Sequence, residues 1–206
     1  LIVVGVLFTT WGLTRVSETG DAGQAFRSAA FTVVSINTTT GFVTDDFNLW
    51  PEYLKLFLVA IMMIGGCSGS TSGSFKVIRI IILLKIIIRE LKSLVYPRAI
   101  FHVKVGDKTV DADDLSNVAA LTFMFMGFTA LGGILLSAMG VDFTTALSAT
   151  VASLFNIGPG LGDVGAMGNY SSIPTMGKGI LILFMLLGRL EIYGVVLLFL
   201  PMTWRK

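Results

Sequence analysis

Charged residues are scarce in this sequence. Only 14% of the 206 residues are Asp, Glu, Lys or Arg, whereas 54% are hydrophobic, and the mean hydropathy is +0.83. A soluble domain of this length needs more charge to stay dissolved. The composition therefore excludes an ordinary soluble domain and indicates that lipid is the solvent for most of the chain.

Cysteine and histidine are nearly missing, since Cys67 and His102 are the single examples of each. One cysteine cannot form a disulfide within the chain, so the redox compartment cannot be read from it. One histidine cannot build a metal cluster alone. Because no His/Asp or Cys/His arrangement falls at one expected membrane depth, we expect neither an enzyme nor a covalent cofactor.

Long apolar runs are the dominant positive feature. A helix needs about 20 apolar residues to cross a bilayer, and segments 56–75, 118–139 and 179–201 are long enough. The run 1–13 is shorter. It lacks the basic start and small-residue cleavage site of a signal peptide, so we interpret it as the tail of a clipped spanning helix.

Two other apolar segments, 25–36 and 143–155, are too short to span a bilayer. Each is either a re-entrant helix or an amphipathic helix lying on the membrane surface. Each runs directly into a glycine, Gly41 or Gly158, which favours the re-entrant interpretation.

Basic residues give the orientation. Eight lie between residues 76 and 108, whereas segment 16–52 carries Arg27 alone beside five acidic residues. The positive-inside rule places the 76–113 connection and the C-terminus in the cytoplasm. The predicted order is span, re-entrant loop, span, cytoplasmic loop, span, re-entrant loop, span.

This order is one unit written twice, at an offset of 117 residues. Among the identical residues that the offset aligns are Phe26 with Phe143, Ala29 with Ala146, Val34 with Val151, Gly41 with Gly158, and Asp46 with Asp163. Repeated membrane units of one orientation share an axis along the membrane normal. A pore on that axis is the natural consequence.

The two glycine loops have the properties of a cation filter. Backbone carbonyls can replace the hydration shell of K⁺, glycine permits the required dihedral angles, and the negative end of a preceding short helix favours a cation. One isolated copy would be a common helix C-cap, but two copies in matching positions favour a filter. The predicted filter residues are Thr39, Thr40, Gly41 and Phe42 in the first loop, and Asn156, Ile157, Gly158 and Pro159 in the second.

A run of small residues interrupts the second span. Such a run disfavours a regular helix; it serves either close helix packing or a break that lines a site or gate. A phosphate-binding loop is excluded because Lys and Ser/Thr do not follow the final glycine directly. We predict a gating loop under the filter, made of Gly65, Gly66, Ser68, Gly69, Ser70, Thr71 and Gly73 and followed by Lys76.

Arg189 is the other anomaly, because a charge in mid-span is costly unless it is paired or hydrated. Glu191 is a poor partner, since residues two apart do not face each other on a helix. Two compatible roles remain open. Arg189 lies in a watery pore and repels cations, or it donates to carbonyls of the glycine-rich loop.

Four motifs together resemble the Trk/Ktr/HKT superfamily of K⁺ transporters, and most closely its bacterial Trk membrane subunit. They are Thr38-Thr39-Thr40-Gly41-Phe42, the run Gly65–Gly73 with Lys76, Asn156-Ile157-Gly158-Pro159-Gly160, and Gly188-Arg189-Leu190-Glu191-Ile192, with Tyr96-Pro97-Arg98-Ala99 in support. The resemblance implies an all-α integral membrane fold of four helix–pore-helix–helix repeats around one pore. This chain matches the third and fourth repeats.

The resemblance also implies boundaries. The third repeat is 1–95, with pore helix and filter 25–42 and interrupted second helix 53–95. A cytoplasmic loop, 96–113, separates it from the fourth repeat, 114–206, which contains helix 115–140, pore helix and filter 143–160, and final helix 175–204.

The family's filter glycines carry over to Gly41 and Gly158, its gating loop to 65–73, and its pore-blocking arginine to Arg189. Asn156 and Pro159 stand where the first loop has Thr39 and Phe42, so the filter is not four-fold symmetric and strict K⁺ over Na⁺ selectivity is in doubt. The implied partners are the lipid bilayer, the missing first two repeats, a second protomer in a homodimer and a cytosolic nucleotide-binding regulatory subunit, with no nucleic acid.

The predicted function is therefore uptake of K⁺, or another monovalent cation, through a pore in a multi-pass protein of the cell membrane. The alternative is a secondary transporter of a small solute built on broken helices. The short helices end, rather than begin, at the glycines, which favours a cation over an anionic solute. Coupling to H⁺ or Na⁺ in symport cannot be read from the residues.

Overall fold

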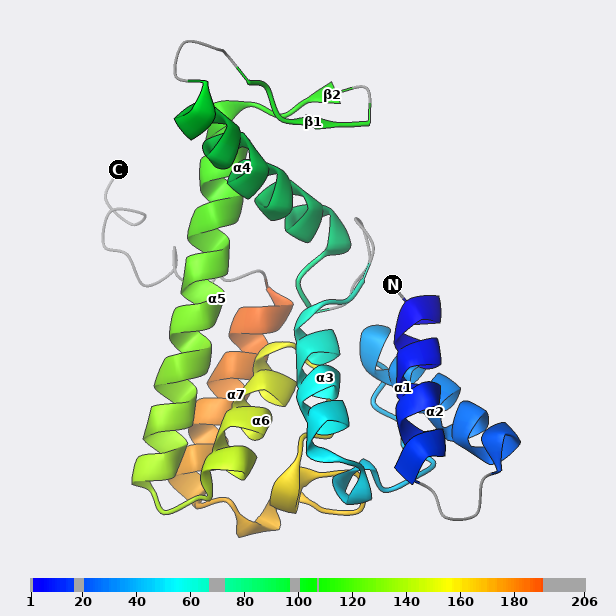
Figure 1. Cartoon of the computed structure of the whole chain (residues 1–206). Coiled ribbons are helices and arrows are strands. Elements are labelled where there is room, and N and C mark those ends of the chain that lie inside the picture. Colours follow the sequence, from blue (N-terminus) through cyan, green and yellow to red (C-terminus); the bar gives the residue numbers. More distant parts are fainter. Residues whose placement is uncertain (1, 17–20, 67–72, 97–100, 107, 191–206) are drawn as a thin grey trace.

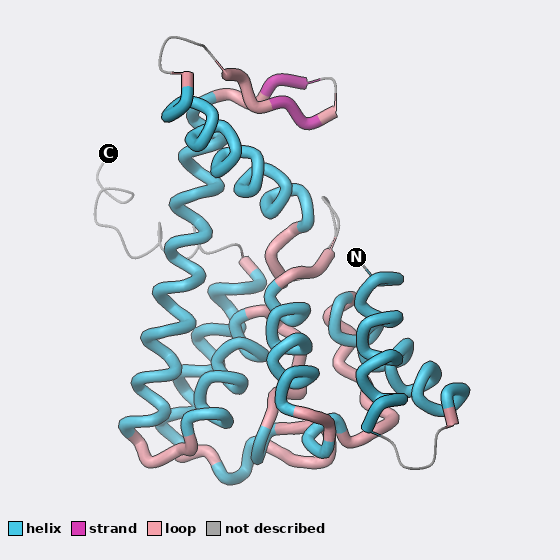
Figure 2. The backbone as a smooth tube through the Cα atoms, in the orientation of Figure 1, coloured by secondary structure: helices cyan, strands magenta, loops and turns pink. Residues whose placement is uncertain are grey.

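The structure is a computed structural model of the chain, and it describes residues 2–16, 21–66, 73–96, 101–106 and 108–190. The backbone of this part is almost entirely helical (Figures 1 and 2). Seven α-helices are joined by short loops, three 3₁₀ turns and one small hairpin.

The first half of the chain consists of α1 (Ile2–Val16), α2 (Ala22–Asn37) and α3 (Glu52–Met63). The carboxylate of Asp21 starts α2 by accepting from the N–H of Gly23 at 3.0 Å. Glycines on α1 allow close packing: Gly5 lies against Val33 of α2, and Gly12 lies against Leu54 of α3.

The second half contains α5 (Ala112–Ala138), α6 (Phe143–Leu154) and α7 (Thr175–Arg189). Asp142 caps α6 as Asp21 caps α2, accepting from the N–H of Thr144 at 3.0 Å. α6 packs against α3, α5 and α7, and nearly every residue from Thr145 to Leu154 is buried. α6 is therefore an internal helix, although it is apolar enough to meet lipid.

The apolar segment 56–75 does not form one spanning helix. α3 ends at Met63, after 12 residues or roughly 18 Å, and α4 (Val77–Val95) begins after the glycine-rich segment and takes a different direction (Figure 2). The prediction of a span over 56–75 is wrong, and the predicted interruption explains why. Two glycines, Gly65 and Gly66, follow Ile64, the C-cap residue of the helix.

One helix in the described residues is long and apolar enough to cross a membrane, within Asp113–Ala138. It corresponds to the predicted helix 115–140, extended at its start. The predicted final helix 175–204 is described as far as Arg189, at the end of α7, and its remainder lies outside the described residues.

The predicted cytoplasmic loop 96–113 contains structure that an all-α fold does not anticipate. Strand β1 (Lys104–Val105) pairs antiparallel with β2 (Lys108–Thr109) next to α4. Gly106, with φ of +61°, takes the left-handed conformation at the turn. Alternating apolar and polar residues in 103–110 around Gly-Asp were the available sequence signal.

Three 3₁₀ turns cover the ends of the helices opposite the hairpin: η1 (Phe47–Leu49), η2 (Gly162–Val164) and η3 (Tyr170–Ser172). The largest of three hydrophobic clusters joins both halves of the chain. Its buried members come from α1, α2 and α3 as well as α5, α6 and α7, and they include Val6, Val33, Leu58, Phe125, Leu154 and Phe184.

The contact between α7 and the end of α6 depends on one glycine. A Cβ at Gly188 would overlap the carbonyl oxygen of Leu154, which is a backbone atom and cannot move aside alone. A Cβ at Gly179, on the same helix, would meet nothing within 4 Å.

We therefore expect Gly188→Ala to destabilise the full-length protein by about 1–3 kcal/mol or more. Gly179→Ala is the matched control and should be neutral or stabilising by up to ~1 kcal/mol. Thermal denaturation of the purified variants in detergent measures both. Equal melting temperatures for the two variants would contradict the proposed contact.

Candidate functional site

The two short helices end in the same way. After α2, the N–H of Thr40 donates to the Ser35 carbonyl (2.9 Å) and the N–H of Thr39 to the Ile36 carbonyl (3.0 Å). After α6, the corresponding bonds run from Ile157 to Ala152 (2.9 Å) and from Asn156 to Ser153 (3.1 Å). Both are Schellman endings, and every donor and acceptor recurs after 117 residues.

Left-handed backbone conformations recur at the same offset. Thr39 and Asn156 have φ of 53° and 54°, while Gly41 and Gly158 have φ of 78° and 111°. Thr39 and Asn156 are the positive-φ residues other than glycine in the described chain. A β-branched residue such as threonine pays for this conformation, so the surrounding structure imposes it.

The two loops approach each other. A Cβ at Gly41 would overlap the carbonyl oxygen of Ile157 and lie 3.2 Å from Cδ of Pro159. Gly158, in contrast, has nothing within 4 Å of its would-be Cβ. Gly41 is thus required by both its φ and its neighbour, whereas Gly158 is required by its φ and faces open space.

Hydroxyl groups fasten each loop to its own half of the chain. Ser35 on α2 donates to the Phe42 carbonyl at 2.7 Å, and Tyr170 on η3 donates to the Gly158 carbonyl at 2.6 Å. Elsewhere in the two loops, the carbonyls of Thr40, Gly41, Asn156 and Ile157 accept no hydrogen bond from the residues that the structure describes. These carbonyls remain able to coordinate a cation.

The ends of the glycine-rich segment are held together by backbone hydrogen bonds. The N–H of Gly65 donates to Phe75 (3.2 Å), that of Phe75 to Met63 (3.1 Å) and that of Val77 to Gly66 (3.2 Å), with a parallel bridge between Ile64 and Phe75. α3 and α4 are thus joined across the break by strand-like pairing.

These ends lie beneath the two loops. A Cβ at Gly65 would come within 2.6 Å of the Asn37 carbonyl, at the end of α2, and one at Gly73 within 2.9 Å of Cβ of Asn156. Of the predicted gating residues, Gly65, Gly66 and Gly73 line this region, and Lys76 directly precedes α4. Ser68, Gly69, Ser70 and Thr71 lie outside the described residues.

Two asparagines connect the short helices to the helices that follow them. The amide of Asn37 donates to the Ile64 carbonyl at 2.8 Å. This carbonyl has no partner within a helix, because α3 ends at Met63. The amide of Asn156 donates to the Met185 carbonyl of α7 at 3.1 Å. Both bonds tie a loop to the helix below it.

Arg189 ends α7, one residue after the contact between Gly188 and Leu154. Its side chain is exposed, and it has no hydrogen-bond or ion-pair partner among the described residues. Glu191 lies outside them. Arg189 therefore stands close to the end of α6 and the start of the second loop.

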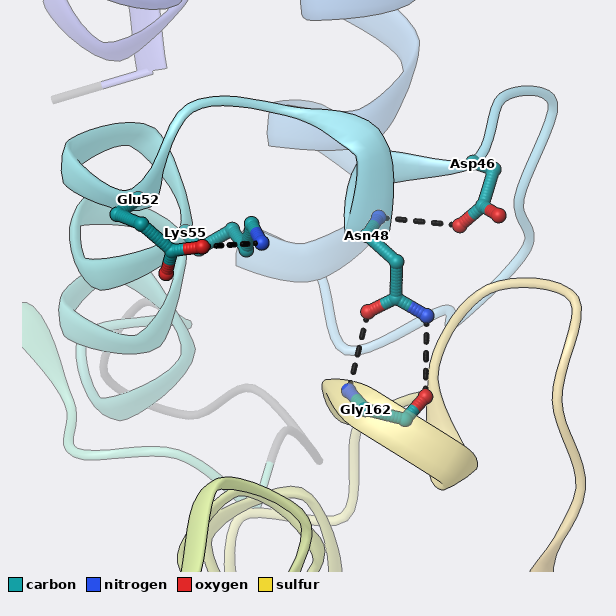
Figure 3. A network of polar contacts seen from close by, with 5 residues as sticks. All are labelled: Asp46, Asn48, Glu52, Lys55 and Gly162. Atoms are coloured by element: carbon teal, nitrogen blue, oxygen red, sulfur yellow. Dashed lines mark hydrogen bonds and ion pairs between the residues drawn. The ribbon is translucent and has the colours of Figure 1, made fainter.

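A side-chain amide joins the outer parts of the two halves (Figure 3). Asn48 of η1 donates to the Gly162 carbonyl and accepts from the Gly162 N–H, both at 3.0 Å. The Asp46 carboxylate accepts from the Asn48 N–H at 3.0 Å and fixes its turn. On the other side, Ser148 of α6 donates to Leu161 (3.0 Å) and accepts from it (2.9 Å).

The outer loop of the second half, which connects α6 to α7 (155–174), contains six more residues than the outer loop of the first half, which connects α2 to α3 (38–51). η1 and η3 both follow a capping side chain, Asp46 or Asn169, that accepts from a backbone N–H two residues later. These caps are 123 residues apart, not 117. The alignment of Asp46 with Asp163 is therefore wrong. The extra residues lie in the segment that Asn48 and Ser148 hold.

Sequence reasoning did not identify Asn37, Asn48 or Tyr170, and it named Gly188 only as part of the motif that contains Arg189. Asn37 had a weak signal, being a polar residue at the end of an apolar helix. Asn48 had none, because its partner is 114 residues away. Tyr170 and Gly188 act through contacts that only the packing of α6 and α7 creates.

Comparisons with known proteins agree with this geometry. A model of the TrkH family, described as a cation transport protein, matches residues 2–206. The chain is 41% identical over its whole length to a Trk system potassium uptake protein TrkH of Halomonas elongata, covering 42% of that protein. It is 42% identical to TrkH of Escherichia coli K12 over 89% of its length, covering 38% of that relative.

A solved structure is also similar. The crystal structure of the potassium transporter TrkH from Vibrio parahaemolyticus superimposes with a TM-score of 0.91 and 38% identity, over 99% of this chain and 43% of that one. The chain thus spans about two fifths of the length of these relatives. With 205 of its residues inside the match to the family (2–206), the chain belongs to the TrkH family of cation transport proteins.

Proposed function

We propose that this chain contributes two of four filter loops to a pore for K⁺ uptake in a multi-pass protein of the cell membrane. The carrying observation is the duplicated loop, in which left-handed residues 39 and 41 recur as 156 and 158. Homologues named as potassium uptake proteins support K⁺ as the ion.

The chemistry of the loops suits a cation. α2 and α6 direct their C-terminal ends, and so the negative ends of their dipoles, at the two loops. Carbonyls with no hydrogen-bond donor among the described residues follow in each loop and can replace part of the ion's hydration shell. The N-terminal ends of α2 and α6 are already capped by Asp21 and Asp142. An anionic solute therefore finds no uncapped N-terminus on either of the two short helices.

We infer two repeats, 1–95 and 114–206, on either side of the cytoplasmic segment 96–113. Two loops cannot enclose an ion alone, so the pore needs two further repeats of the same polypeptide. α2 supports this inference, because it exposes Phe26, Phe31 and Val34 whereas α6 is buried on nearly all sides. α6 packs against three other α-helices, α3, α5 and α7, whereas α2 packs mainly against α1 and α3 among the described residues.

The proposed gate has two parts below the loops. The segment 65–73 has its described ends under one loop each, so a change in its path would open or close the space beneath both. Arg189 adds a positive charge near the same level. A homodimer and a cytosolic nucleotide-binding subunit docking near 76–113 complete the proposed assembly.

The filter is tested with two alanine substitutions of equal backbone cost. Gly158 and Gly140 both have positive φ (111° and 86°) and open space at Cβ, so each substitution costs about 1–2 kcal/mol. Gly158→Ala should reduce K⁺ over Na⁺ discrimination by roughly tenfold, or about 1.4 kcal/mol. Gly140→Ala, in the turn before α6, should leave discrimination unchanged.

The measurement is ⁸⁶Rb⁺ uptake by the full-length protein in liposomes, with Na⁺ as competitor. Unchanged discrimination in the Gly158 variant would remove this loop from the filter. Uptake of a neutral or anionic solute with no Rb⁺ flux would instead support a secondary transporter of a small solute.

Arg189 is tested by removing its charge. If the guanidinium repels cations below the filter, Arg189→Gln should raise ⁸⁶Rb⁺ flux several-fold, since a fixed positive charge beside a pore raises the electrostatic barrier to a cation. Arg189→Lys keeps the charge and should resemble the wild type. Reduced flux at normal expression would favour a purely structural role.

Asn48 is expected to act as a positioning residue for the filter. Asn48→Ala removes both bonds to Gly162, and Asn48→Asp keeps the acceptor but loses the donor, so discrimination should fall in the order Asn, Asp, Ala. Gln24→Ala, an exposed amide on α2, is the control. A lower melting temperature with unchanged Rb⁺/Na⁺ ratio would make the bond structural only.

A further inference from the structure

A row of apolar side chains on α4 is not covered by the rest of the described chain. Leu84, Ile87, Leu91 and Leu94 are all more than half exposed, with Leu94 at 78%. α4 is too polar to qualify as a membrane span. An amphipathic helix of this kind lies at the membrane interface with its apolar row in contact with acyl chains.

Basic residues lie on a different face of the same helix, and Ile88, which lines the pocket described below and is 50% exposed, lies between them and the apolar row. Lys85, Arg89 and Lys92 are spaced four and three residues apart, so they share one face. They form one wall of a pocket of about 360 Å³, and the segment 101–104 forms the other. The lining carries four permanent positive charges, the fourth from Lys104, together with His102 and no acidic residue.

The pocket is held in place by packing and hydrogen bonding. Val103 is buried against Ile82 of α4 and Leu115 of α5, which fixes the segment 101–104 beside α4. The Lys85 ammonium donates to the Lys104 carbonyl across the pocket. Arg89 is the one lining cation with an acidic neighbour, since it pairs with Glu90 at 2.6 Å.

We propose that this pocket binds the phosphate of an anionic phospholipid from the cytoplasmic leaflet. Lys85, Lys92 and Lys104 would surround the phosphodiester, and the acyl chains would lie along the apolar row of α4. Basic pockets on the cytoplasmic side of membrane proteins bind such headgroups. The adjoining apolar row is what favours a lipid over a free phosphate or nucleotide, neither of which would gain from it.

This site lies on α4 and the hairpin and shares no residue with the filter loops, so it does not depend on the proposed permeation pathway. The test is lipid binding by the full-length protein in mild detergent, measured by native mass spectrometry during titration with phosphatidylglycerol or phosphatidylcholine. Wild-type protein should bind phosphatidylglycerol at least about tenfold more tightly than phosphatidylcholine.

The triple variant K85Q/K92Q/K104Q should bind phosphatidylglycerol roughly a hundredfold more weakly, because each basic residue near an anionic headgroup contributes to affinity. The matched control R27Q/K55Q/K178Q removes three charges from the predicted outer side and should stay within about twofold of wild type. K85R/K92R/K104R preserves the charges and should retain binding. Elution volume and melting temperature without added lipid report whether each variant is folded.

Several results would overturn the proposal. One is equal affinity of the wild type for the two lipids, and another is an equal loss in the outer-side control. A third is equal binding of phosphatidylglycerol and of glycerophosphoglycerol, which lacks acyl chains, because this would indicate a free phosphate site. If K85Q/K92Q/K104Q kept its affinity for phosphatidylglycerol but no longer bound a cytosolic subunit, the pocket would be assigned to a protein partner.

Discussion

The structure depends on one constraint, which is that two helix ends and the irregular backbone after them lie inside the protein. Backbone groups at membrane depth must find partners in the protein or in water. Here the Schellman bonds satisfy the last turns of α2 and α6. Asn37 and Asn156 then satisfy carbonyls of the neighbouring helices. Without these bonds the chain would bury unpaired polar groups at a cost of about 1–3 kcal/mol each.

The two halves satisfy this constraint differently. Asn37 is the last residue of α2, whereas Asn156 lies two residues beyond the end of α6 and is itself left-handed. The second half also carries the longer outer loop, which is tied to α6 by Ser148 and to the first half by Asn48. The same backbone motif thus recurs in the two halves with different side-chain contacts.

The sequence predicted features that depend on local chemistry. The short apolar runs 25–36 and 143–155 located α2 and α6, and glycines located the break after α3, because glycine disfavours helix wherever it occurs. The positive φ values at Gly41 and Gly158 were implied by the role proposed for them. Thr39 and Asn156 were predicted as filter residues because they precede Gly41 and Gly158 in the two loops. Their left-handed backbone was not foreseen, because threonine seldom adopts it.

Other features required the packed structure. The true offset between η1 and η3 was hidden, since a six-residue insertion leaves no mark in a constant-offset alignment and Asp46 happened to align with another aspartate. The bond between Asn48 and Gly162 joins residues 114 apart. The hairpin near α4 was overlooked because the strands hold two residues each.

The bridge between Ile64 and Phe75 has a mechanical meaning. It holds the two ends of the glycine-rich segment together, so that the segment forms a closed loop between the end of α3 and the start of α4. The entropic cost of closing such a loop grows only slowly with its length, as the logarithm of the number of residues.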